Sequence, residues 1–200
     1  MRLVLSEFIS LDGVIQAPGG RKEDPDGGFE HGGWSMRYFD EEAMGVAIDE
    51  AMAKTDSYVF GRRTWQVSAD AWPQREGQDP FADKLNSIPK YVASRTLSQD
   101  DLAVWNNSHL LDPNDALGAI AELKSQDGGD ISCYGSANLA AQLIAADMVD
   151  ELSLMIEPVI LGGGKRLFPE DGVLRGLELV SNTTAKTGVQ IAKYQRKAGS

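Results

Sequence analysis

Apolar stretches of strand length alternate with amphipathic helical patterns along nearly the whole chain. This alternation is typical of an α/β fold with a mainly parallel sheet, because parallel strands are joined by crossover helices. We therefore predict about eight strands and about four helices. The expected strands are residues 3–9, 57–60, 91–93, 104–105, 131–134, 151–159, 177–183 and 189–194, the last two forming an antiparallel hairpin. The expected helices are residues 40–54, 114–124 and 139–146 and one that starts beside Thr64.

Composition limits the classes of protein to which the chain can belong. Its 200 residues are 42% hydrophobic and 24% charged, which suits one folded domain over residues 1–200. The net charge of −11 argues against nucleic-acid binding, because a phosphate backbone needs clustered cations. With Cys133 as the single cysteine and two histidines, we expect neither a disulfide nor a metal site. No secretory signal or membrane-spanning run is visible, so we expect a cytoplasmic protein without a membrane partner.

Residues 12–38, which we call the long loop, contain the pairs Gly19-Gly20, Gly27-Gly28 and Gly32-Gly33. Loops of this length inside a compact domain are uncommon and are usually functional. We expect the long loop to act as a lid, with Trp34 as a candidate wall of the substrate pocket. The alternative is a mobile surface insertion.

Polar residues and a glycine follow the expected strand at residues 57–60. Gly61 permits a sharp turn or a close backbone approach, and Thr64 is a candidate cap for the helix that starts there. The N–H groups of the helix start, with Arg62 or Arg63 beside them, form a set of donors for an anion. The segment thus indicates either an anion site or an ordinary capped helix with solvated arginines.

Two further strand ends have similar chemistry. Ser94-Arg95-Thr96 places a guanidinium between two hydroxyls, a set that suits a phosphate monoester. Gly135-Ser136-Ala137-Asn138 leads directly into a helix and suits a pyrophosphate. Ligands of open α/β sheets bind beyond the carboxyl ends of the strands, so we expect the three segments to meet. Together they favour a dinucleotide with a separate phosphate, which means NADPH rather than NADH.

The run Gly162-Gly163-Gly164-Lys165-Arg166 lacks the spacing of a P-loop, and no helical pattern follows it. We expect a flexible loop near the active site, and a phosphate-binding loop is the alternative. The chain has no Gly-x-Ser-x-Gly elbow and no plausible Cys–His pair, so the sequence gives no support for hydrolysis through a nucleophile.

Several motifs follow one another in a recognisable order. They are Ser10-Leu11-Asp12-Gly13-Val14-Ile15, Phe60-Gly61-Arg62-Arg63-Thr64-Trp65, Ser94-Arg95-Thr96, Tyr134-Gly135-Ser136-Ala137, Pro158-Val159-Ile160-Leu161-Gly162-Gly163-Gly164 and Leu167-Phe168. Their order resembles that of the dihydrofolate reductase-like superfamily, most closely the branch that contains the reductase domain of the riboflavin-biosynthesis deaminase/reductase. The resemblance implies a mainly parallel eight-stranded sheet flanked by helices, with an antiparallel C-terminal hairpin.

The same resemblance implies an NADPH-dependent reductase for a small molecule, similar to 5-amino-6-(5-phosphoribosylamino)uracil reductase or dihydrofolate reductase, and makes a homodimer plausible. It implies that Phe8 lies on the substrate side. It implies cofactor contacts in four groups: Gly61, Arg62, Arg63 and Thr64 at a phosphate; Ser94, Arg95 and Thr96 at the adenosine-ribose phosphate; Gly135, Ser136, Ala137 and Asn138 at the pyrophosphate; and Ile15 and Ala17 over the nicotinamide.

The chain departs from the folate-reducing members at one position. Those proteins carry a carboxylate on the helix before the Gly-Arg strand, and the matching position here is near Met44 and Gly45. The candidate proton donors are therefore Asp49 and Glu42, with an ordered water as the alternative. The missing acid also favours a second hypothesis, a nucleotide- or ligand-binding protein without turnover. A purely structural assembly partner is a third hypothesis.

Overall fold

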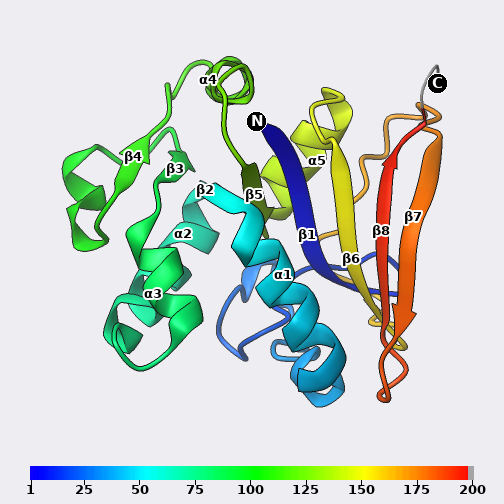
Figure 1. Ribbon diagram of the computed structural model, residues 1–200. Coiled ribbons are helices and arrows are strands. Elements are labelled where there is room, and N and C mark those ends of the chain that lie inside the picture. The colour runs from blue at the N-terminus through cyan, green and yellow to red at the C-terminus, as the bar shows by residue number, and fades with distance from the viewer. Residues whose placement is uncertain (198–200) are drawn as a thin grey trace.

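Eight strands form one sheet, in the order β4-β3-β2-β5-β1-β6-β8-β7, in the computed structural model, which describes residues 1–197 (Figure 1). The last three residues of the domain predicted over residues 1–200 lie outside the described part. The strands from β4 to β6 in this order are parallel, and β8 and β7 form the antiparallel hairpin at one edge. The strands are β1 (Arg2–Ser10), β2 (Thr55–Gly61), β3 (Lys90–Ala93), β4 (Ser108–Leu110), β5 (Asp130–Tyr134), β6 (Glu151–Glu157), β7 (Leu177–Thr184) and β8 (Gln190–Arg196).

Helices cover both faces of the sheet because alternate side chains of each strand point to opposite faces. Leu5 of β1 belongs to a core with Leu139 and Leu143 on one face, whereas Phe60 of β2 packs with Trp65 on the other. Accordingly, α1 passes in front of the sheet and α5 lies behind it in Figure 1. None of the helices in residues 1–197 has the length and apolar character needed to cross a membrane. The α-helices are α1 (Val46–Lys54), α2 (Arg62–Ala71), α3 (Pro80–Ser87), α4 (Ala116–Lys124) and α5 (Ala137–Ala145), and the π-helical turn Glu41–Gly45 leads into α1.

The predicted fold class is confirmed, including the parallel sheet and the C-terminal hairpin, but two local predictions differ from the structure. The strand predicted at residues 104–105 is wrong, since Asp100–Val104 forms a 3₁₀ turn and the edge strand follows at Ser108–Leu110. Trp105 is buried there because its ring packs near Phe60 and its Nε1 donates to Asn86 Oδ1 at 2.7 Å. Helix α3 was not predicted, although Asp79 caps it and Pro80 is its first residue.

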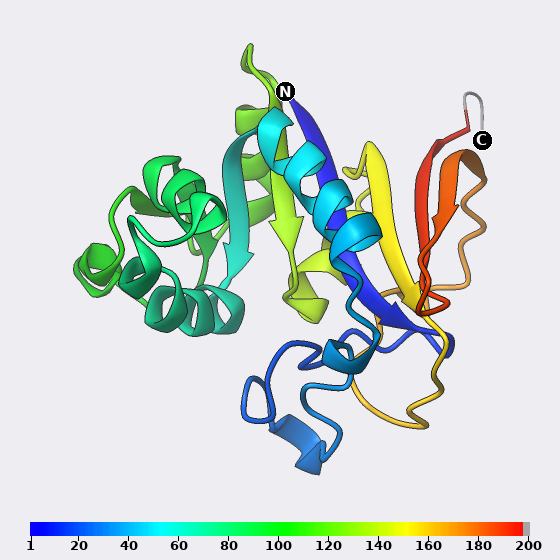
Figure 2. The same cartoon turned by 60° about the horizontal axis from the view of Figure 1, so that its bottom comes forward.

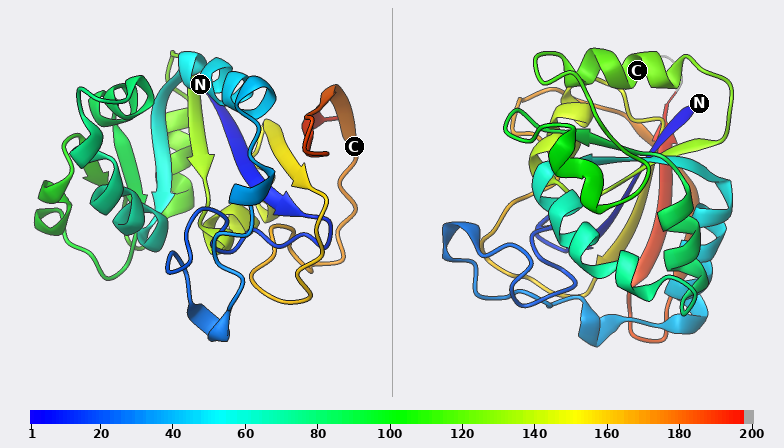
Figure 3. Two further views of the ribbon diagram at one scale, coloured as in Figure 1. Left: turned by 90° about the horizontal axis from the view of Figure 1, so that it is seen from below. Right: turned by 90° about the vertical axis from the view of Figure 1, so that its left-hand side faces the viewer.

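The topology creates a crevice where neighbouring strands send their helices to opposite faces. Strand β2 leads into α2 on one face, and its neighbour β5 leads into α5 on the other. Ligands of open α/β sheets bind at such a switch point. The long loop and the segment between β6 and β7 lie below the carboxyl ends of these strands in Figure 2, and Figure 3 shows the same end of the sheet from below.

Candidate functional site

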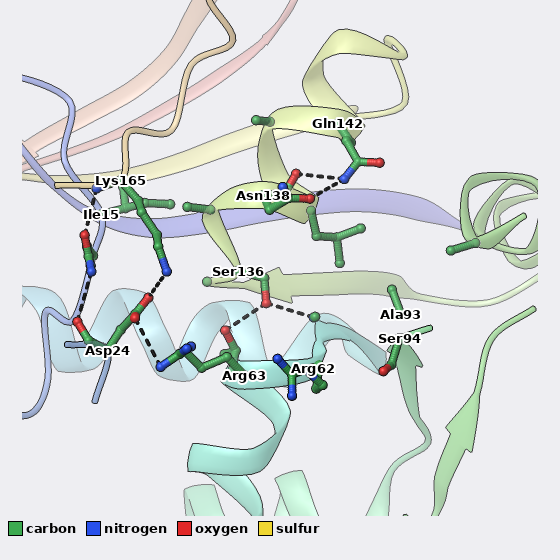
Figure 4. Close-up of a pocket in the computed structure, with 18 of the residues that line it drawn as sticks. Ile15, Asp24, Arg62, Arg63, Ala93, Ser94, Ser136, Asn138, Gln142 and Lys165 are labelled. Atoms are coloured by element: carbon green, nitrogen blue, oxygen red, sulfur yellow. Dashed lines mark hydrogen bonds and ion pairs between the residues drawn. The ribbon is translucent and has the colours of Figure 1, made fainter. Parts of the chain in front are cut away.

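A cavity of about 950 Å³ lies at this switch point, beyond the ends of β2, β3 and β5. Figure 4 shows Ile15 and Asp24 at one end of it, Ala93 and Ser94 at the other, and Arg62 and Ser136 between them. The cavity has the size of a site for a large organic ligand. Its lining includes every residue predicted to contact a cofactor: Ile15, Ala17, Gly61, Arg62, Arg63, Thr64, Ser94, Arg95, Thr96, Gly135, Ser136, Ala137 and Asn138. The prediction that the three strand ends meet at one place is therefore confirmed.

The ends of β2 and β5 are joined by the hydroxyl of Ser136. Ser136 Oγ accepts a hydrogen bond of 2.8 Å from Gly61 N and donates one of 2.8 Å to Thr64 Oγ1. A Cβ atom on Gly61 would lie 2.3 Å from Ser136 Oγ, so only glycine allows this approach. Gly135 and Ser136 both have positive φ angles, of 66° and 65°, which turn the chain sharply into α5.

Thr64 does not cap α2, contrary to prediction. The helix begins at Arg62, so Thr64 is its third residue, and its hydroxyl accepts from Ser136 instead. Gly61 occupies the cap position and has no side chain to accept a helix N–H group.

Helices α2 and α5, which open on the cavity, differ from α3 and α4 in how they begin. Helices α3 and α4 start with aspartates that accept backbone hydrogen bonds: Phe81 N donates to Asp79 Oδ1 and Gly118 N donates to Asp115 Oδ1, each at 2.9 Å. Helices α2 and α5 have no side-chain cap hydrogen bond. Their first N–H groups and the positive ends of their dipoles therefore remain available beside the cavity, where they favour an anion.

Three arginines of the lining, Arg62, Arg95 and Arg166, have no hydrogen-bond or ion-pair partner for their side chains within residues 1–197. All three are exposed. Arg95 follows the buried Ser94, whose Oγ accepts Thr96 N and Leu97 N at 3.1 Å each and so fixes the turn after β3. The turn thus presents a guanidinium and the Thr96 hydroxyl at one end of the cavity.

The other two cations of the cavity are held by acidic residues of the long loop. Asp24, Asp26, Arg63 and Lys165 form what we call the ion-pair cluster, in which each cation contacts both carboxylates at 2.6 to 3.3 Å. The hydrogen bond and charge of Lys165, with those of Arg63, lower the pKa of the Asp26 carboxyl. Arg63 is therefore paired with acidic residues of the long loop, whereas Arg62 has no ion-pair partner within the described residues.

The segment after β6 packs against the long loop at the cavity. Ile15 N donates to Lys165 O at 3.0 Å, and Lys165 N donates to Gln16 Oε1 at 2.9 Å. Gly164 has φ of 120°, and a Cβ atom there would lie 2.8 Å from Val14 Cγ1. Lys165 and Arg166 line the cavity; the sequence predicted that their segment lies near the active site but assigned neither residue a contact.

The long loop is anchored to the sheet as well. Trp34 Nε1 donates to Gln16 O at 2.8 Å, and Ser35 Oγ donates to Glu157 Oε1 at 2.6 Å. Ile9 N donates to the other oxygen of Glu157 at 3.1 Å. Burial raises the pKa of Glu157 to about 7, and these hydrogen bonds only partly offset that effect. The loop is therefore packed on the carboxyl ends of β1 and β6.

Four predicted residues lie outside the cavity lining. Phe8 packs on the α1 face with Met44, and Trp34 is 2% exposed inside the long loop. Glu42 and Asp49 are exposed, and Glu42 pairs with Lys186 of the C-terminal hairpin. Helix α1 turns its apolar residues towards the sheet, so its acidic residues point away from it. The structure therefore does not bring the two predicted proton donors to this cavity.

Two further carboxyl groups were missed: one lines the cavity, and the other lies outside its lining and binds the turn at Gly135. Glu7 Oε1 accepts a hydrogen bond of 3.0 Å from Gly135 N, and burial raises its pKa well above the usual value. Glu23 lines the cavity, accepts from Gly19 N and Gly20 N at 2.8 and 2.9 Å, and also has a pKa raised by burial. A signal for Glu7 was present in the sequence, because in a strand it alternates onto the apolar face of Leu5.

Comparison with known proteins relates the whole chain to one family. Residues 2–191 match the family described as the RibD C-terminal domain. The uncharacterized protein YyaP of Bacillus subtilis (strain 168) is 30% identical over 94% of this chain and 91% of its own. The uncharacterized protein YwjB of the same organism is 27% identical over 84% of this chain and 83% of its own.

Solved structures show the same fold. A crystal structure named "Putative riboflavin biosynthesis protein", from Shewanella sp. PV-4, superposes with a TM-score of 0.73 at 19% identity, over 98% of this chain and 99% of its own. A pyrimidine reductase-like protein from Corynebacterium diphtheriae superposes with a TM-score of 0.61 at 14% identity, over 98% of this chain and 92% of its own. The similar folds and the match over nearly the whole chain agree with the resemblance found in the sequence, and this protein belongs to the RibD C-terminal domain family.

Proposed function

We propose that this protein is an NADPH-dependent reductase that transfers hydride to a small heterocyclic, pyrimidine- or pterin-like, or carbonyl substrate. The family match and the names of the two structural neighbours favour reductase chemistry and a pyrimidine-like substrate class. We also propose that the protein acts in the cytoplasm, and that a homodimer is its assembly.

The observation that carries the proposal is the pair of uncapped helix starts on opposite sides of one cavity. Helices α2 and α5 leave N–H donors beside a space that Arg62 also lines, which suits the pyrophosphate of a dinucleotide. Arg95 and Thr96 form a separate donor group at one end, which suits the additional phosphate that distinguishes NADPH from NADH.

When bound, NADPH would supply the hydride, and the protein would supply position and environment. The donors of α2, α5 and the turn after β3 would hold the phosphates. Ile15 and Ala17, which the packed long loop holds at the other end of the cavity, would cover the nicotinamide and exclude water.

The test is to titrate the protein with NADPH and NADH and to follow tryptophan fluorescence. We then expect oxidation of NADPH, seen as loss of the absorbance of the reduced nicotinamide, with at least one member of a panel of pyrimidine, pterin and carbonyl compounds. Absence of saturable NADPH binding at millimolar concentration would falsify the proposal.

A second candidate is a nucleotide-binding protein without turnover. It is favoured by the positions of Glu42 and Asp49, which leave the cavity without a carboxylate from the helix before β2. Saturable NADPH binding without oxidation across the whole panel would support this candidate against the reductase.

A further inference from the structure

Glu23 is a carboxyl group of the long loop that lines the cavity. Its Oε2 accepts hydrogen bonds from Gly19 N at 2.8 Å and from Gly20 N at 2.9 Å. Within residues 1–197, its Oε1 has no hydrogen-bond partner, and no cation forms an ion pair with either oxygen. The two glycine N–H groups therefore hold one oxygen in place and leave the other available to a bound molecule.

Glu23 belongs to the end of the cavity that the long loop covers. Ile15 and Ala17 line this end and come from the same loop. Figure 4 shows Ile15 there together with Asp24, the neighbour of Glu23 in the chain, and shows Ser94 at the opposite end. The proposed function places the nicotinamide beside Ile15 and Ala17, so Glu23 lies at the end where hydride would be transferred.

The other ionisable residues of the lining are less suited to giving up a proton. Asp24 pairs through its two oxygens with Arg63 and Lys165. Lys165 in turn pairs with both Asp24 and Asp26. The arginines of the lining keep their protons at any pH at which the protein is folded. Among the lining residues that the structure describes, Glu23 is therefore the acid that is free to deliver a proton.

We propose that Glu23 is the proton donor of the reductase, whose carboxyl group protonates the substrate atom next to the carbon that receives hydride. The inference rests on the proposed function, which supplies the nicotinamide at this end of the cavity. In this step the substrate carbon of a C=N or C=O group gains the hydride of NADPH, the π electron pair moves to the nitrogen or oxygen, and that atom binds the proton of Glu23. The products are the reduced substrate, NADP⁺ and the Glu23 carboxylate, which regains its proton from water.

The acidic neighbours of Glu23 favour its protonated form. Burial raises the pKa of Glu23 above 4.5, the N–H groups of Gly19 and Gly20 offset part of this rise, and the negative charge of Asp24 adds to it. Strand β1 contributes Glu7, a buried carboxyl group outside the lining, whose own pKa is raised in part by the charge of Glu23. Neighbouring carboxyl groups resist carrying charge together, so one of them tends to keep its proton.

Cations also lie at this end of the cavity. Helix α2 presents Arg63 and the segment after β6 presents Lys165, and both are paired with the aspartates of the ion-pair cluster. The segment after β6 also presents Arg166, which forms no ion pair with Glu23 or with another acid of residues 1–197. The cations Arg21-Lys22 of the long loop are exposed. The net effect of these surroundings is a raised pKa, which suits a general acid.

The experiment compares the wild-type protein with Glu23→Gln. Glutamine keeps a carbonyl oxygen that can accept Gly19 N and Gly20 N, but it has no acidic proton. The substrates are the panel that tests the proposed function, with dihydrobiopterin as its C=N member and phenylglyoxal as its C=O member. Glu23→Gln should lower kcat by about 100- to 10,000-fold, the usual contribution of a general acid. Its affinity for NADPH, measured by tryptophan fluorescence, should not fall.

Glu30→Gln is the matched control, because Glu30 is an exposed acid of the same loop that does not line this cavity. It should keep the kcat of the wild-type protein. Glu42→Gln changes a donor predicted from the sequence, and it should also keep kcat because Glu42 lies outside the lining.

Two further measurements separate proton donation from a role in the structure of the long loop. Acetic acid at about pH 5 should restore part of the kcat lost in Glu23→Ala, whereas sodium chloride at the same ionic strength should not. Carbon NMR of the protein without ligand, labelled in its glutamate carboxyl groups, should show that Glu23 titrates above pH 4.5. The absence of its signal from Glu23→Gln identifies the resonance.

Three outcomes overturn the assignment of Glu23 and leave the proposed function intact: a kcat of Glu23→Gln within about threefold of wild type, an equal loss in Glu30→Gln, or no recovery of Glu23→Ala with acetic acid. Titration of Glu23 at or below pH 4.5 overturns it as well, because the carboxyl group would then have no proton to give near neutral pH. If the wild-type protein oxidises NADPH with no compound of the panel, the proposed reductase function itself fails, and this inference fails with it.

Discussion

Lys165 Nζ lies 2.6 Å from Asp24 Oδ2, and this ion pair fastens the segment after β6 to the long loop. Asp24 also pairs with Arg63 at the start of α2, at 3.3 Å, so one carboxylate links three parts of the cavity wall. A phosphate that enters the cavity competes with this carboxylate for the same two cations. The ion-pair cluster is therefore expected to influence how quickly and how tightly anions bind.

Replacing Asp24 with Asn should accelerate NADPH binding and tighten it severalfold. The substitution removes two ion pairs and leaves Arg63 and Lys165 with more of their charge for a ligand. Stopped-flow measurement of tryptophan fluorescence gives the association rate. Asp147→Asn is the control, because Asp147 pairs with Arg175 and Arg196 and does not line the cavity. Slower or weaker binding would instead mean that the ion-pair cluster holds the long loop in the form that binds.

Replacing Arg95 with Ala should weaken NADPH binding by about 10- to 100-fold, because a hydrogen bond to a charged group contributes about 1.5–3 kcal/mol. NADH binding should change by less than about threefold, since NADH lacks the phosphate assigned to Arg95. Titrations with both nucleotides measure the difference. Arg37→Ala, an exposed arginine of the long loop that does not line the cavity, should leave both affinities unchanged. Equal losses for the two nucleotides would reject the assignment of Arg95.

Replacing Gly61 with Ala should lower the free energy of unfolding by about 1–3 kcal/mol, as expected for an atom forced into a filled space. Its backbone, with φ of −78° and ψ of 160°, accepts alanine, so the cause is the contact of 2.3 Å with Ser136 Oγ. Urea unfolding measures the change. Gly163→Ala, where a Cβ atom meets nothing within 4 Å, should have little effect. Adding Ser136→Gly should restore part of the loss, and failure of this rescue would show that the contact is not the cause.

The raised pKa of Glu157 should make the stability of the protein depend on pH. Burial raises its pKa from 4.5 to about 7, so the folded protein binds this proton more tightly than the unfolded chain. The resulting stabilisation is complete below about pH 4.5 and is lost as the pH rises through about 7, a change of up to about 3 kcal/mol. Unfolding free energies measured across this range should fall less steeply for Glu157→Gln than for the wild-type protein. Identical slopes would mean that Glu157 titrates as it does in the unfolded chain.

The meeting of Gly61, Arg95 and Ser136 at one cavity was predictable from the sequence. Each follows a short apolar strand, and the rule that ligands bind beyond the carboxyl ends of parallel strands depends on chain direction rather than on side-chain detail. The C-terminal hairpin was predictable for a similar reason, because two apolar segments flank a short turn that contains Gly188.

The charges around the cavity were not predictable. The contact between Asp24 and Lys165 joins residues 141 positions apart, and no local pattern shows which acid meets which base. Glu42 and Asp49 were assigned to the site from their place on a helix, but which face of that helix meets the sheet depends on packing against Met44. Glu7 was overlooked because its role depends on its hydrogen bond with Gly135 N, a contact that only the folded structure shows.

The missing caps of α2 and α5 have a consequence for the protein in the cell. A helix start without a capping side chain lacks about 1 kcal/mol of stabilisation. A bound anion can accept hydrogen bonds from the first N–H groups of α2 and α5, as aspartates do in α3 and α4. Ligand occupancy and resistance to heat and proteolysis are then coupled, so the melting temperature should rise with the concentration of the nucleotide. The level of that nucleotide in the cell would help to set how much of the protein persists.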